Sequence, residues 1–284
     1  MNISLDSALG RQRRLNQVGE TINSIATPAA AYSLRSLTGG DPLAVRVRRD
    51  TGGGAGDDDE EDFTVSEINS GALVAFVGSG NNGFVDTWYD QIGSNNLVQD
   101  GASNQPQIVN SGSLLSDGIE FDGSNDRLVS SSPITITTSS DISFSLVGES
   151  DNITSTQTII SQKSGTGQGR SWTDIVSSNF RTSIGGSAKT FGAVSANGTT
   201  FLYTFIFDES ANTANAFKNG SQSGSQRTIN AAEAANGELV VGSNNGETGQ
   251  FLNGHLKELI VYLSDQSSNR VALETNINSH YSIF

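Results

Sequence analysis

The stretch that decides the fold is Thr200-Phe-Leu-Tyr-Thr-Phe-Ile-Phe207, in which apolar side chains follow one another almost without interruption. Successive residues of a β-strand point to opposite faces of the sheet. A strand that is apolar on both faces must be covered on both sides, so this run predicts a central strand of a β-sheet core.

Turn signals surround this strand at short intervals. Asn-Gly tolerates the left-handed backbone of a tight hairpin, and the pair occurs at Asn82, Asn197, Asn219, Asn236, Asn245 and Asn253. Between the turns lie runs typical of strands: Phe84–Tyr89, Gly118–Phe121, Ile142–Val147, Thr158–Ser161, Ala214–Lys218, Glu238–Gly242 and Leu256–Leu263. Short strands at this spacing predict an all-β jelly-roll sandwich of two antiparallel sheets.

The composition excludes several classes of protein. The net charge is −14, from 16 basic and 30 acidic residues, whereas nucleic-acid binding needs a basic surface. The chain has no cysteine, which excludes disulfides and thiolate metal sites. Charged residues interrupt the first 25 residues, so we expect no secretory signal, and no apolar run predicts membrane insertion.

Residues 1–27 differ from the rest of the chain. Leu15, Val18, Ile22 and Ile25 follow the 3-4-3 spacing of a helical seam, and Pro28 ends the segment. One interpretation is an amphipathic helix packed on its own domain. The other is a docking or oligomerisation segment that attaches the β-sandwich of residues 28–284 to a larger assembly.

Two further segments stand out by composition. The run Asp57–Asp62 holds six consecutive acidic residues, which predicts a solvated hairpin loop or a loop that attracts calcium. At the other end, residues 266–280 contain neither glycine nor proline and predict a helix capped by Ser264 or Asp265. We expect Val271, Ile277 and Tyr281 to face the sandwich.

Two motifs resemble a known fold family. Gly118-Ile-Glu-Phe-Asp-Gly-Ser-Asn-Asp126 resembles the opening hairpin of concanavalin A-like (laminin G-like) domains, and Phe251-Leu-Asn-Gly-His-Leu-Lys-Glu-Leu-Ile-Val-Tyr262 resembles their closing strand. The resemblance implies that these two strands pair. The blocks Ala30–Arg35, Ala44–Arg49 and Thr87–Gln91 are similar to a region that precedes such domains in proteins of tailed, often marine, bacteriophages. Trp88-Tyr-Asp-Gln91 also resembles a segment of the arabinofuranosidase B catalytic domain.

Candidate ligand-binding residues are of two kinds. An aromatic face stacks on a sugar ring while polar side chains bind its hydroxyls. This chemistry predicts a glycan site at Trp88, Tyr89, Asp90, Gln91, Asn95 and Asn96, with Trp172 as a second, exposed platform. The alternative is that Trp88 anchors the core and its polar neighbours brace a turn. Asp122, Asn125 and Asp126 are candidate calcium ligands, or the side chains that close a turn. We expect no cofactor, with calcium as the alternative.

No catalytic motif is recognisable. A glycosidase needs a pair of carboxylates, and the candidates are Asp86, Asp90, Glu120, Asp122, Asp126 and Glu258. None of these lies in the strand motif of laminarinase-type sandwich enzymes. The two histidines cannot make a three-histidine metal site. We therefore expect no enzymatic activity, with a glycoside hydrolase of arabinofuranosidase type as the alternative.

The resemblance to phage proteins sets the functional expectation. It implies a virion protein, either a tail fibre or adhesin that binds host surface polysaccharide or a purely structural piece such as a capsid decoration. Its expected partners are other virion proteins, bound through the N-terminal segment, and a homo-oligomer, with a trimer favoured because similar phage fibres are threefold. We expect neither nucleic acid nor a membrane among its partners, and a location in the virion.

Overall fold

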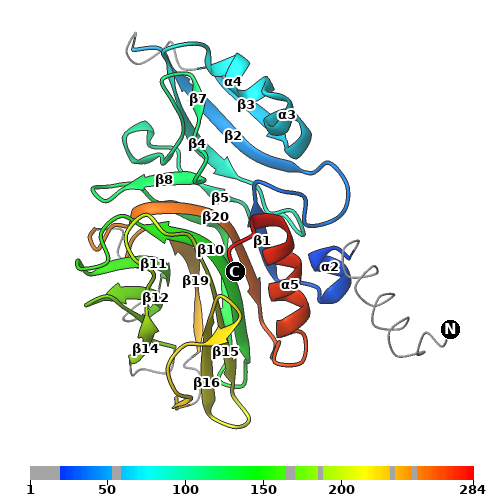
Figure 1. The fold of residues 1–284 in the computed structure, drawn as a ribbon, viewed down its shortest axis with the longest axis vertical. Helices are drawn as coiled ribbons and strands as arrows, with labels where there is room; N and C mark the ends of the chain where they lie inside the picture. The colour runs from blue at the N-terminus through cyan, green and yellow to red at the C-terminus, as the bar shows by residue number, and fades with distance from the viewer. Residues whose placement is uncertain (1–19, 53–58, 164–169, 185–187, 231–233, 245–247) are drawn as a thin grey trace, which may run out of the picture.

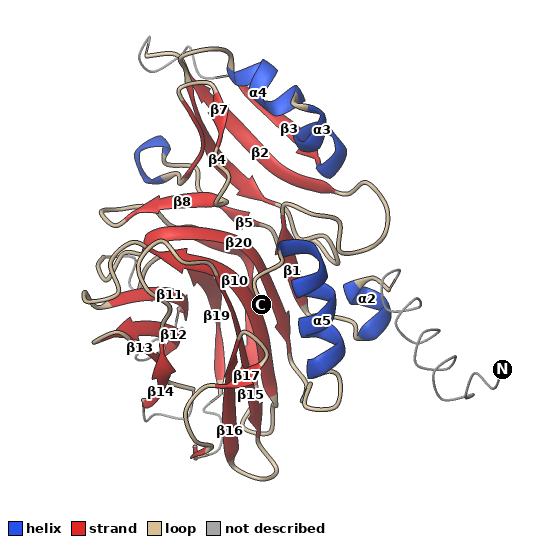
Figure 2. Cartoon of the chain, viewed as in Figure 1, coloured by secondary structure: helices blue, strands red, loops and turns tan. Residues whose placement is uncertain are grey.

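The computed structural model describes residues 20–52, 59–163, 170–184, 188–230, 234–244 and 248–284. Two antiparallel sheets face one another, and a smaller strand layer with two short helices extends them at one end (Figures 1 and 2). The predicted all-β sandwich is confirmed. Among the described residues, no helix is long and apolar enough to cross a bilayer.

The first sheet is built around the last strand of the chain. Its strands, in order of pairing, are Asn253–Tyr262 (β20), Ile142–Ser150 (β10), Phe201–Asp208 (β15) and Thr213–Lys218 (β16), with the short Ser221–Gln222 (β17) and Arg227–Thr228 (β18) beyond. On the other edge of β20 lie two strands end to end, Ile119–Asp122 (β8) and Ala30–Ser33 (β1). The expected antiparallel pairing of the strand near Gly118 with the closing strand is confirmed, with Ile119 opposite Leu256.

The second sheet covers the first. It contains Leu128–Ile136 (β9), Ala235–Val241 (β19), Gln157–Gln162 (β11), Arg170–Val176 (β12), Asn179–Thr182 (β13) and Lys189–Ala193 (β14), paired in that order.

A third group of strands joins the two sheets. Leu43–Asp50 (β2) pairs with Glu60–Thr64 (β3) and with Asn82–Trp88 (β4), and helices Val65–Ser70 (α3) and Ala72–Val77 (α4) follow β3. One half of β4 pairs with Gln107–Asn110 (β6), which leads through β8 to the first sheet. The other half pairs with Leu97–Val98 (β5), which leads to β9 in the second. The short Ala102–Asn104 (η1) and Ser113–Leu114 (β7) complete this group.

Aromatic side chains fill the space between the sheets. Phe144 on β10 stacks on Trp172 of β12 with ring centroids 6.1 Å apart, and Phe180 of β13 stacks on Tyr203 of β15 at 3.9 Å. Strand β15 is buried from Phe201 to Phe207 and is flanked by β10 and β16. It is therefore the central strand that its sequence predicts.

Helix α5, Arg270–Tyr281, covers the outer face of the first sheet (Figure 1). The expected helix begins later than predicted, because Asp265 accepts the backbone N–H of Ser267 and a turn occupies residues 267–269. Ile277 is buried as predicted, whereas Val271 is 61% exposed, so the prediction that it faces the sandwich is wrong.

The described part of the N-terminal segment packs on its own domain. Ile22–Ile25 forms a short helix (α2), and Ile22 is fully buried in a cluster with Leu273 and Ile277 of α5, against which Ile25 also packs. Ile22 is therefore not available to an intermolecular seam, whereas Ile25 is only partly buried. Leu15 and Val18, the other half of the predicted seam, lie outside the described residues.

The acidic run is not wholly a loop. Glu60, Glu61 and Asp62 belong to β3, where they lie opposite Arg48, Val47 and Arg46 of β2. The prediction of a loop is wrong for this half of the run, because Arg46 and Arg48 of the neighbouring strand supply the opposite charge. The first two residues of the run lie outside the described residues.

Candidate functional site

A row of chemically active side chains crosses the molecule along neighbouring strands. Directly opposite residues of antiparallel strands point to the same face. The ladder places Arg48 of β2 opposite Phe84 of β4, Phe84 opposite Gln107 of β6, Gln107 opposite Glu120 of β8, Glu120 opposite His255 of β20, and His255 opposite Glu149 of β10. We call these six residues the cross-strand row.

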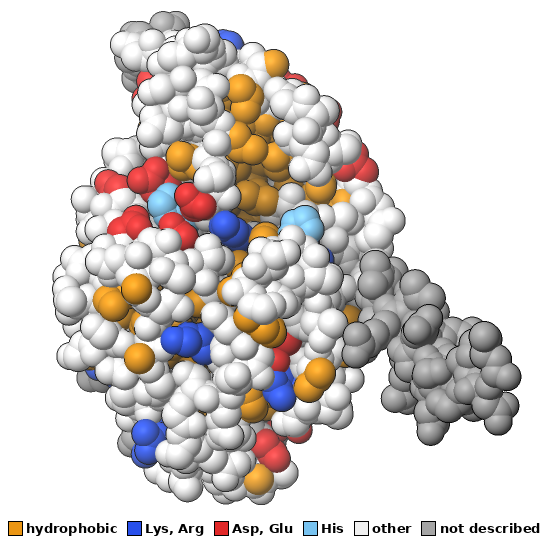
Figure 3. All heavy atoms as spheres, in the orientation of Figure 1, with side chains coloured by type: hydrophobic (Ala, Val, Ile, Leu, Met, Phe, Trp, Pro, Cys, Tyr) orange, Lys and Arg blue, Asp and Glu red, His pale blue; other side chains and the backbone are white. Residues whose placement is uncertain are grey.

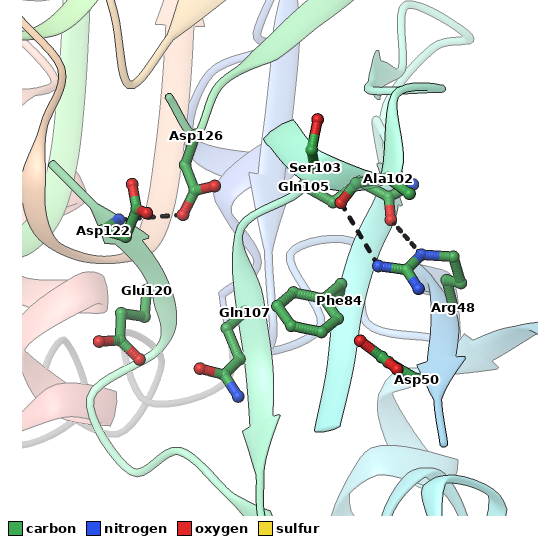
Figure 4. Close-up of a pocket in the computed structure, with 10 residues that line it drawn as sticks. All are labelled: Arg48, Asp50, Phe84, Ala102, Ser103, Gln105, Gln107, Glu120, Asp122 and Asp126. Atoms are coloured by element: carbon green, nitrogen blue, oxygen red, sulfur yellow. Dashed lines mark hydrogen bonds between the residues drawn. The ribbon is translucent and has the colours of Figure 1, made fainter. Parts of the chain in front are cut away.

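The middle of this row forms the wall of a pocket of about 360 Å³. Figure 4 shows Glu120, Asp122 and Asp126 on one side of it, and Arg48, Asp50 and the Phe84 ring on the other. The pocket is lined by Arg48, Asp50, Phe84, Ala102, Ser103, Gln105, Gln107, Glu120, Asp122 and Asp126. We call it the acidic cleft.

The basic side of the cleft is held rigid. Arg48 is only 7% exposed, and its Nε donates to Oε1 of Gln105 at 2.7 Å. Its guanidinium lies 5.0 Å from the centroid of the Phe84 ring, a cation–π contact. Gln105 also donates to Asp86 at 3.3 Å, so this carboxylate supports the wall from behind.

The acidic side is less constrained. Glu120 is half-buried, and none of the described residues donates a hydrogen bond or an ion pair to its carboxylate. Its neighbours Ile119 and Phe121 are fully buried on the opposite face of β8. The alternation of the strand therefore turns Glu120 and Asp122 toward the cleft while their neighbours anchor the strand in the core.

The three predicted calcium ligands lie at this side of the cleft. Oδ1 of Asp122 accepts the backbone N–H groups of Ser124 and Asn125, at 2.8 and 3.3 Å, and closes the turn after β8. Asn125 donates to the backbone oxygen of Ser103 at 2.7 Å, and Oδ2 of Asp126 accepts the N–H of Asp122 at 2.9 Å. The turn-closing role that the sequence left open is thus present, and calcium binding here remains a prediction.

Asp126 is the residue of the cleft whose pKa departs most clearly from its usual value. Burial raises the pKa of its carboxyl to about 7, the negative charges of Asp122 and Glu120 act in the same direction, and the N–H of Asp122 opposes them. Its side chain belongs to a residue that is only 7% exposed. At neutral pH this carboxyl is therefore divided between its protonated and ionised forms.

The predicted glycan platform around Trp88 is an internal brace. Trp88 is fully buried with its ring 5.9 Å from that of Tyr32, so it offers no free face to a sugar. Asp90 accepts backbone N–H groups of Ala31, Ile92 and Asn95. The remaining side chains make similar internal bonds: Gln91 to the backbone of Ser33, Arg35 and Leu37, Asn95 to Ser132, Asn96 to Asp90, and Tyr89 to Asp62.

The second predicted platform is also internal. Trp172 is fully buried and stacks on Phe144, so the expectation of an exposed ring is wrong. Its polar neighbours in the sequence misled the prediction, because alternate residues of β12 face opposite sides of the sheet. Of the candidate carboxylates, Glu258 is fully buried and accepts hydrogen bonds from Arg35, Ser33 and Tyr281.

A second pocket, of about 210 Å³, differs in character. Figure 3 shows apolar side chains gathered over the strand layer that carries α3 and α4, with a histidine at the lower edge of the patch. The lining includes Leu34, Ile68, Leu114, Leu115, Lys257, His280 and Tyr281. The described lining of this pocket holds no carboxylate and one amide, that of Asn69, so the acidic cleft is the better candidate for a site that recognises a polar ligand.

Comparison with known proteins places the fold. No protein-family model matches the chain, and no curated protein matches its sequence. An arabinofuranosidase complexed with arabinofuranosyl-α-1,2-xylobiose is similar in structure, with a TM-score of 0.56 and 14% identity over 88% of this chain and 62% of that one. Trypanosoma rangeli sialidase, in complex with 2,3-difluorosialic acid, is similar with a TM-score of 0.50 and 11% identity over 69% of this chain and 31% of that one. The chain spans less than two thirds of either protein, and at this identity the likeness shows a shared β-sandwich fold.

Proposed function

We propose that this protein binds carbohydrate in the acidic cleft. The observation that carries the proposal is the set of side chains that converge there: an unpaired carboxylate at Glu120, the amide of Gln107 and the ring of Phe84, beside a fixed guanidinium at Arg48. Carboxylates and amides bind sugar hydroxyls in pairs, and an aromatic side chain covers the apolar face of the ring. A volume of about 360 Å³ suits one sugar residue or two.

The fold supports this proposal. Two of the similar structures are of glycoside-acting enzymes, one described with an arabinofuranosyl-xylobiose and one with a sialic acid derivative. Because the acidic cleft is negatively charged, we expect it to favour neutral or cationic sugars over sialic acid. Arabinose- and xylose-containing oligosaccharides are therefore the first ligands to test.

The test is calorimetric titration of the full chain with such oligosaccharides, after a screen on a glycan array. We expect Glu120→Gln and Phe84→Ala each to weaken binding at least tenfold, or about 1.4 kcal/mol. Glu61→Gln is the matched control, because it removes one exposed carboxylate from β3, outside the cleft. Equal binding by Glu120→Gln and the control would contradict the proposal.

Glycoside hydrolysis is a second candidate function, and one observation favours it. The raised pKa of Asp126, about 7, is that of a group able to donate a proton near neutral pH, and the carboxyls of Glu120 and Asp122 line the same cleft. A glycosidase needs such a proton donor together with a second carboxyl nearby. Release of 4-nitrophenol from aryl glycosides, abolished by Asp126→Asn but not by Glu61→Gln, would establish it. Binding without turnover would leave the binding function alone.

We further propose that the protein acts in a phage particle as a tail fibre or adhesin that presents the cleft to host polysaccharide, the alternative being a capsid decoration. Support for this context comes from the sequence resemblance alone. Localisation by cryo-electron microscopy of purified particles tests it, and sedimentation of the isolated protein tests the favoured trimer. A protein absent from the particle would refute the virion role and leave sugar binding to be judged separately.

A further inference from the structure

A second group of side chains lies at the far end of the cross-strand row. Glu149 and His255 are opposite one another on β10 and β20, and Asp151 follows β10 directly. One donor atom from each of these three residues lies within 4.8 Å of the other two. Figure 3 shows a histidine surrounded by acidic side chains on the face where β8 and β20 run.

A nitrogen of the imidazole lies close to the two carboxylates without a hydrogen bond to either. Nδ1 of His255 lies 3.3 Å from Oε1 of Glu149 and 3.8 Å from Oδ2 of Asp151. This nitrogen is buried and has no hydrogen-bond partner among the described residues. A buried polar atom without a partner is costly, so an arrangement that retains one calls for an explanation.

These separations suit three ligands of one metal ion. Zinc binds a histidine nitrogen or a carboxylate oxygen at about 2.0–2.2 Å, which places two ligand atoms of a tetrahedral site about 3.4 Å apart. The 3.3 Å and 3.8 Å separations lie close to that value. An ordinary hydrogen bond between imidazole and carboxylate would be shorter, at about 2.7–2.9 Å.

The surroundings of the cluster hold its ligands in place. Oε2 of Glu149 accepts the hydroxyl of Thr200 at 3.1 Å, which leaves Oε1 free to face the histidine. The N–H of Asp151 donates to the backbone oxygen of Asn253 at 2.9 Å. A Cβ atom on Gly254 would collide with the carbonyl of Glu149, so a glycine is required where the two strands approach most closely.

The exposure of the three side chains leaves room for an external ligand. The Glu149 and His255 side chains are 7% and 13% exposed, whereas that of Asp151 is 40% exposed. Within the described residues, the ion pairs of both carboxylates are with His255 alone. A protein that supplies three ligands and leaves the fourth position open to water or substrate is the usual arrangement of an accessible zinc site.

We infer that Glu149, Asp151 and His255 form a binding site for a divalent transition metal, with zinc as the ion that the donor set fits best. One nitrogen and two carboxylate oxygens suit zinc or manganese, whereas calcium prefers six to eight oxygen ligands. The site lies beside Glu120, which is opposite His255 in the ladder, but it does not depend on sugar binding in the cleft.

The test is calorimetric titration of the metal-free full chain with zinc chloride alone. We expect one zinc per chain, and His255→Ala and Asp151→Asn to weaken binding at least tenfold. His280→Ala is the matched control, because the chain has only two histidines and no cysteine. This control retains the cluster and should bind as the unaltered protein does. Calcium chloride in place of zinc should give much weaker binding.

Two results would overturn the inference. One is the absence of zinc binding at micromolar concentration, and the other is binding that His255→Ala leaves unchanged. Since Asp151 is exposed, Asp151→Asn should fold normally, and equal melting temperatures without metal would establish this. Imidazole signals in nuclear magnetic resonance spectra add a direct readout: zinc should shift the signals of His255 and leave those of His280 in place.

Discussion

Carboxylates gather at β3 and again at the acidic cleft, but their surroundings differ. At β3, Arg46 holds Asp62 through two hydrogen bonds of 2.8 and 3.0 Å, and Arg49 pairs with Asp59. At the cleft, Asp126 lies beside the like charges of Asp122 and Glu120. The first arrangement pairs its acidic side chains with arginines of the neighbouring strand, whereas the second gathers three carboxylates of one short segment, residues 120–126, close to one another.

The difference appears in the pKa values of two aspartates. Hydrogen bonds from Arg46 lower the pKa of Asp62, and its bond from Tyr89 assists while burial opposes. Burial raises the pKa of Asp126 to about 7. Acidic density alone therefore says little about function, and the partners of each carboxylate separate a structural group from one available to a ligand.

We expect the largest loss of stability from replacing a buried side chain that β3 and β8 have in common. Each acidic strand carries a fully buried phenylalanine, Phe63 on β3 and Phe121 on β8, and an added Cβ on Gly242 would collide with the Phe121 ring. We expect Phe63→Ala and Phe121→Ala each to lower the free energy of unfolding by about 3–5 kcal/mol. Urea denaturation measures both. A loss of under about 1 kcal/mol in either would show that this strand is not anchored as described.

A smaller effect concerns the pH dependence of stability, which should differ between the two regions. In the unfolded chain an aspartate releases its proton near pH 4, whereas folded Asp126 keeps it to about pH 7. Between these values the folded state binds more protons, so the contribution of Asp126 to stability falls as pH rises. The free energy of unfolding of Asp126→Asn, measured relative to that of the unaltered protein, should therefore rise by on the order of 1–3 kcal/mol from pH 4 to pH 8. Melting curves at the two pH values measure this, and a constant difference would contradict it.

The contribution of Asp62 to stability should change with pH in the opposite direction and by a smaller amount. Its lowered pKa means that its stabilising contribution is present above about pH 4 and is lost as the pH falls through the folded value. Because the pair is partly exposed, we expect Asp62→Asn to cost less than about 1 kcal/mol at pH 7. The cost should shrink in 1 M salt and at low pH. Melting curves that show a cost independent of both would point to the lost Tyr89 hydrogen bond instead.

The smallest effect is expected at Glu61. Its side chain is exposed on β3, and Glu61→Gln should change stability by less than about 0.5 kcal/mol at any pH. The same denaturation series measures it. A larger change would mean that the exposed part of the acidic run also contributes to the fold.

The sequence predicted those parts of the fold that depend on local patterns. The apolar run of β15 and the glycine-bounded strand of β8 each carry their own signal, and both lie where expected. The start of α5 was misplaced because the competing turn at Asp265 depends on a side-chain hydrogen bond. The two tryptophans were misjudged because burial depends on the opposing sheet, which no single strand reveals.

The candidate site was predicted only in part. Glu120, Asp122 and Asp126 were recognised as carboxylates of interest, and the alternation of Ile119 and Phe121 with Glu120 and Asp122 already indicates a polar face on that strand. The cross-strand row as a whole was missed, because its six members come from six strands and only the register of pairing brings them together.

The position of β20 has a consequence for how the chain matures during synthesis. This late strand pairs with β10 on one edge and with both β1 and β8 on the other. Until the ribosome has released Asn253–Tyr262, three earlier strands lack the neighbour that satisfies their backbone groups. Loop closure over such separations is slow, and unpaired edges invite association with other chains. These edges of β1, β8 and β10 therefore stay open until Asn253–Tyr262 has emerged, and the pairing of this one strand closes all three.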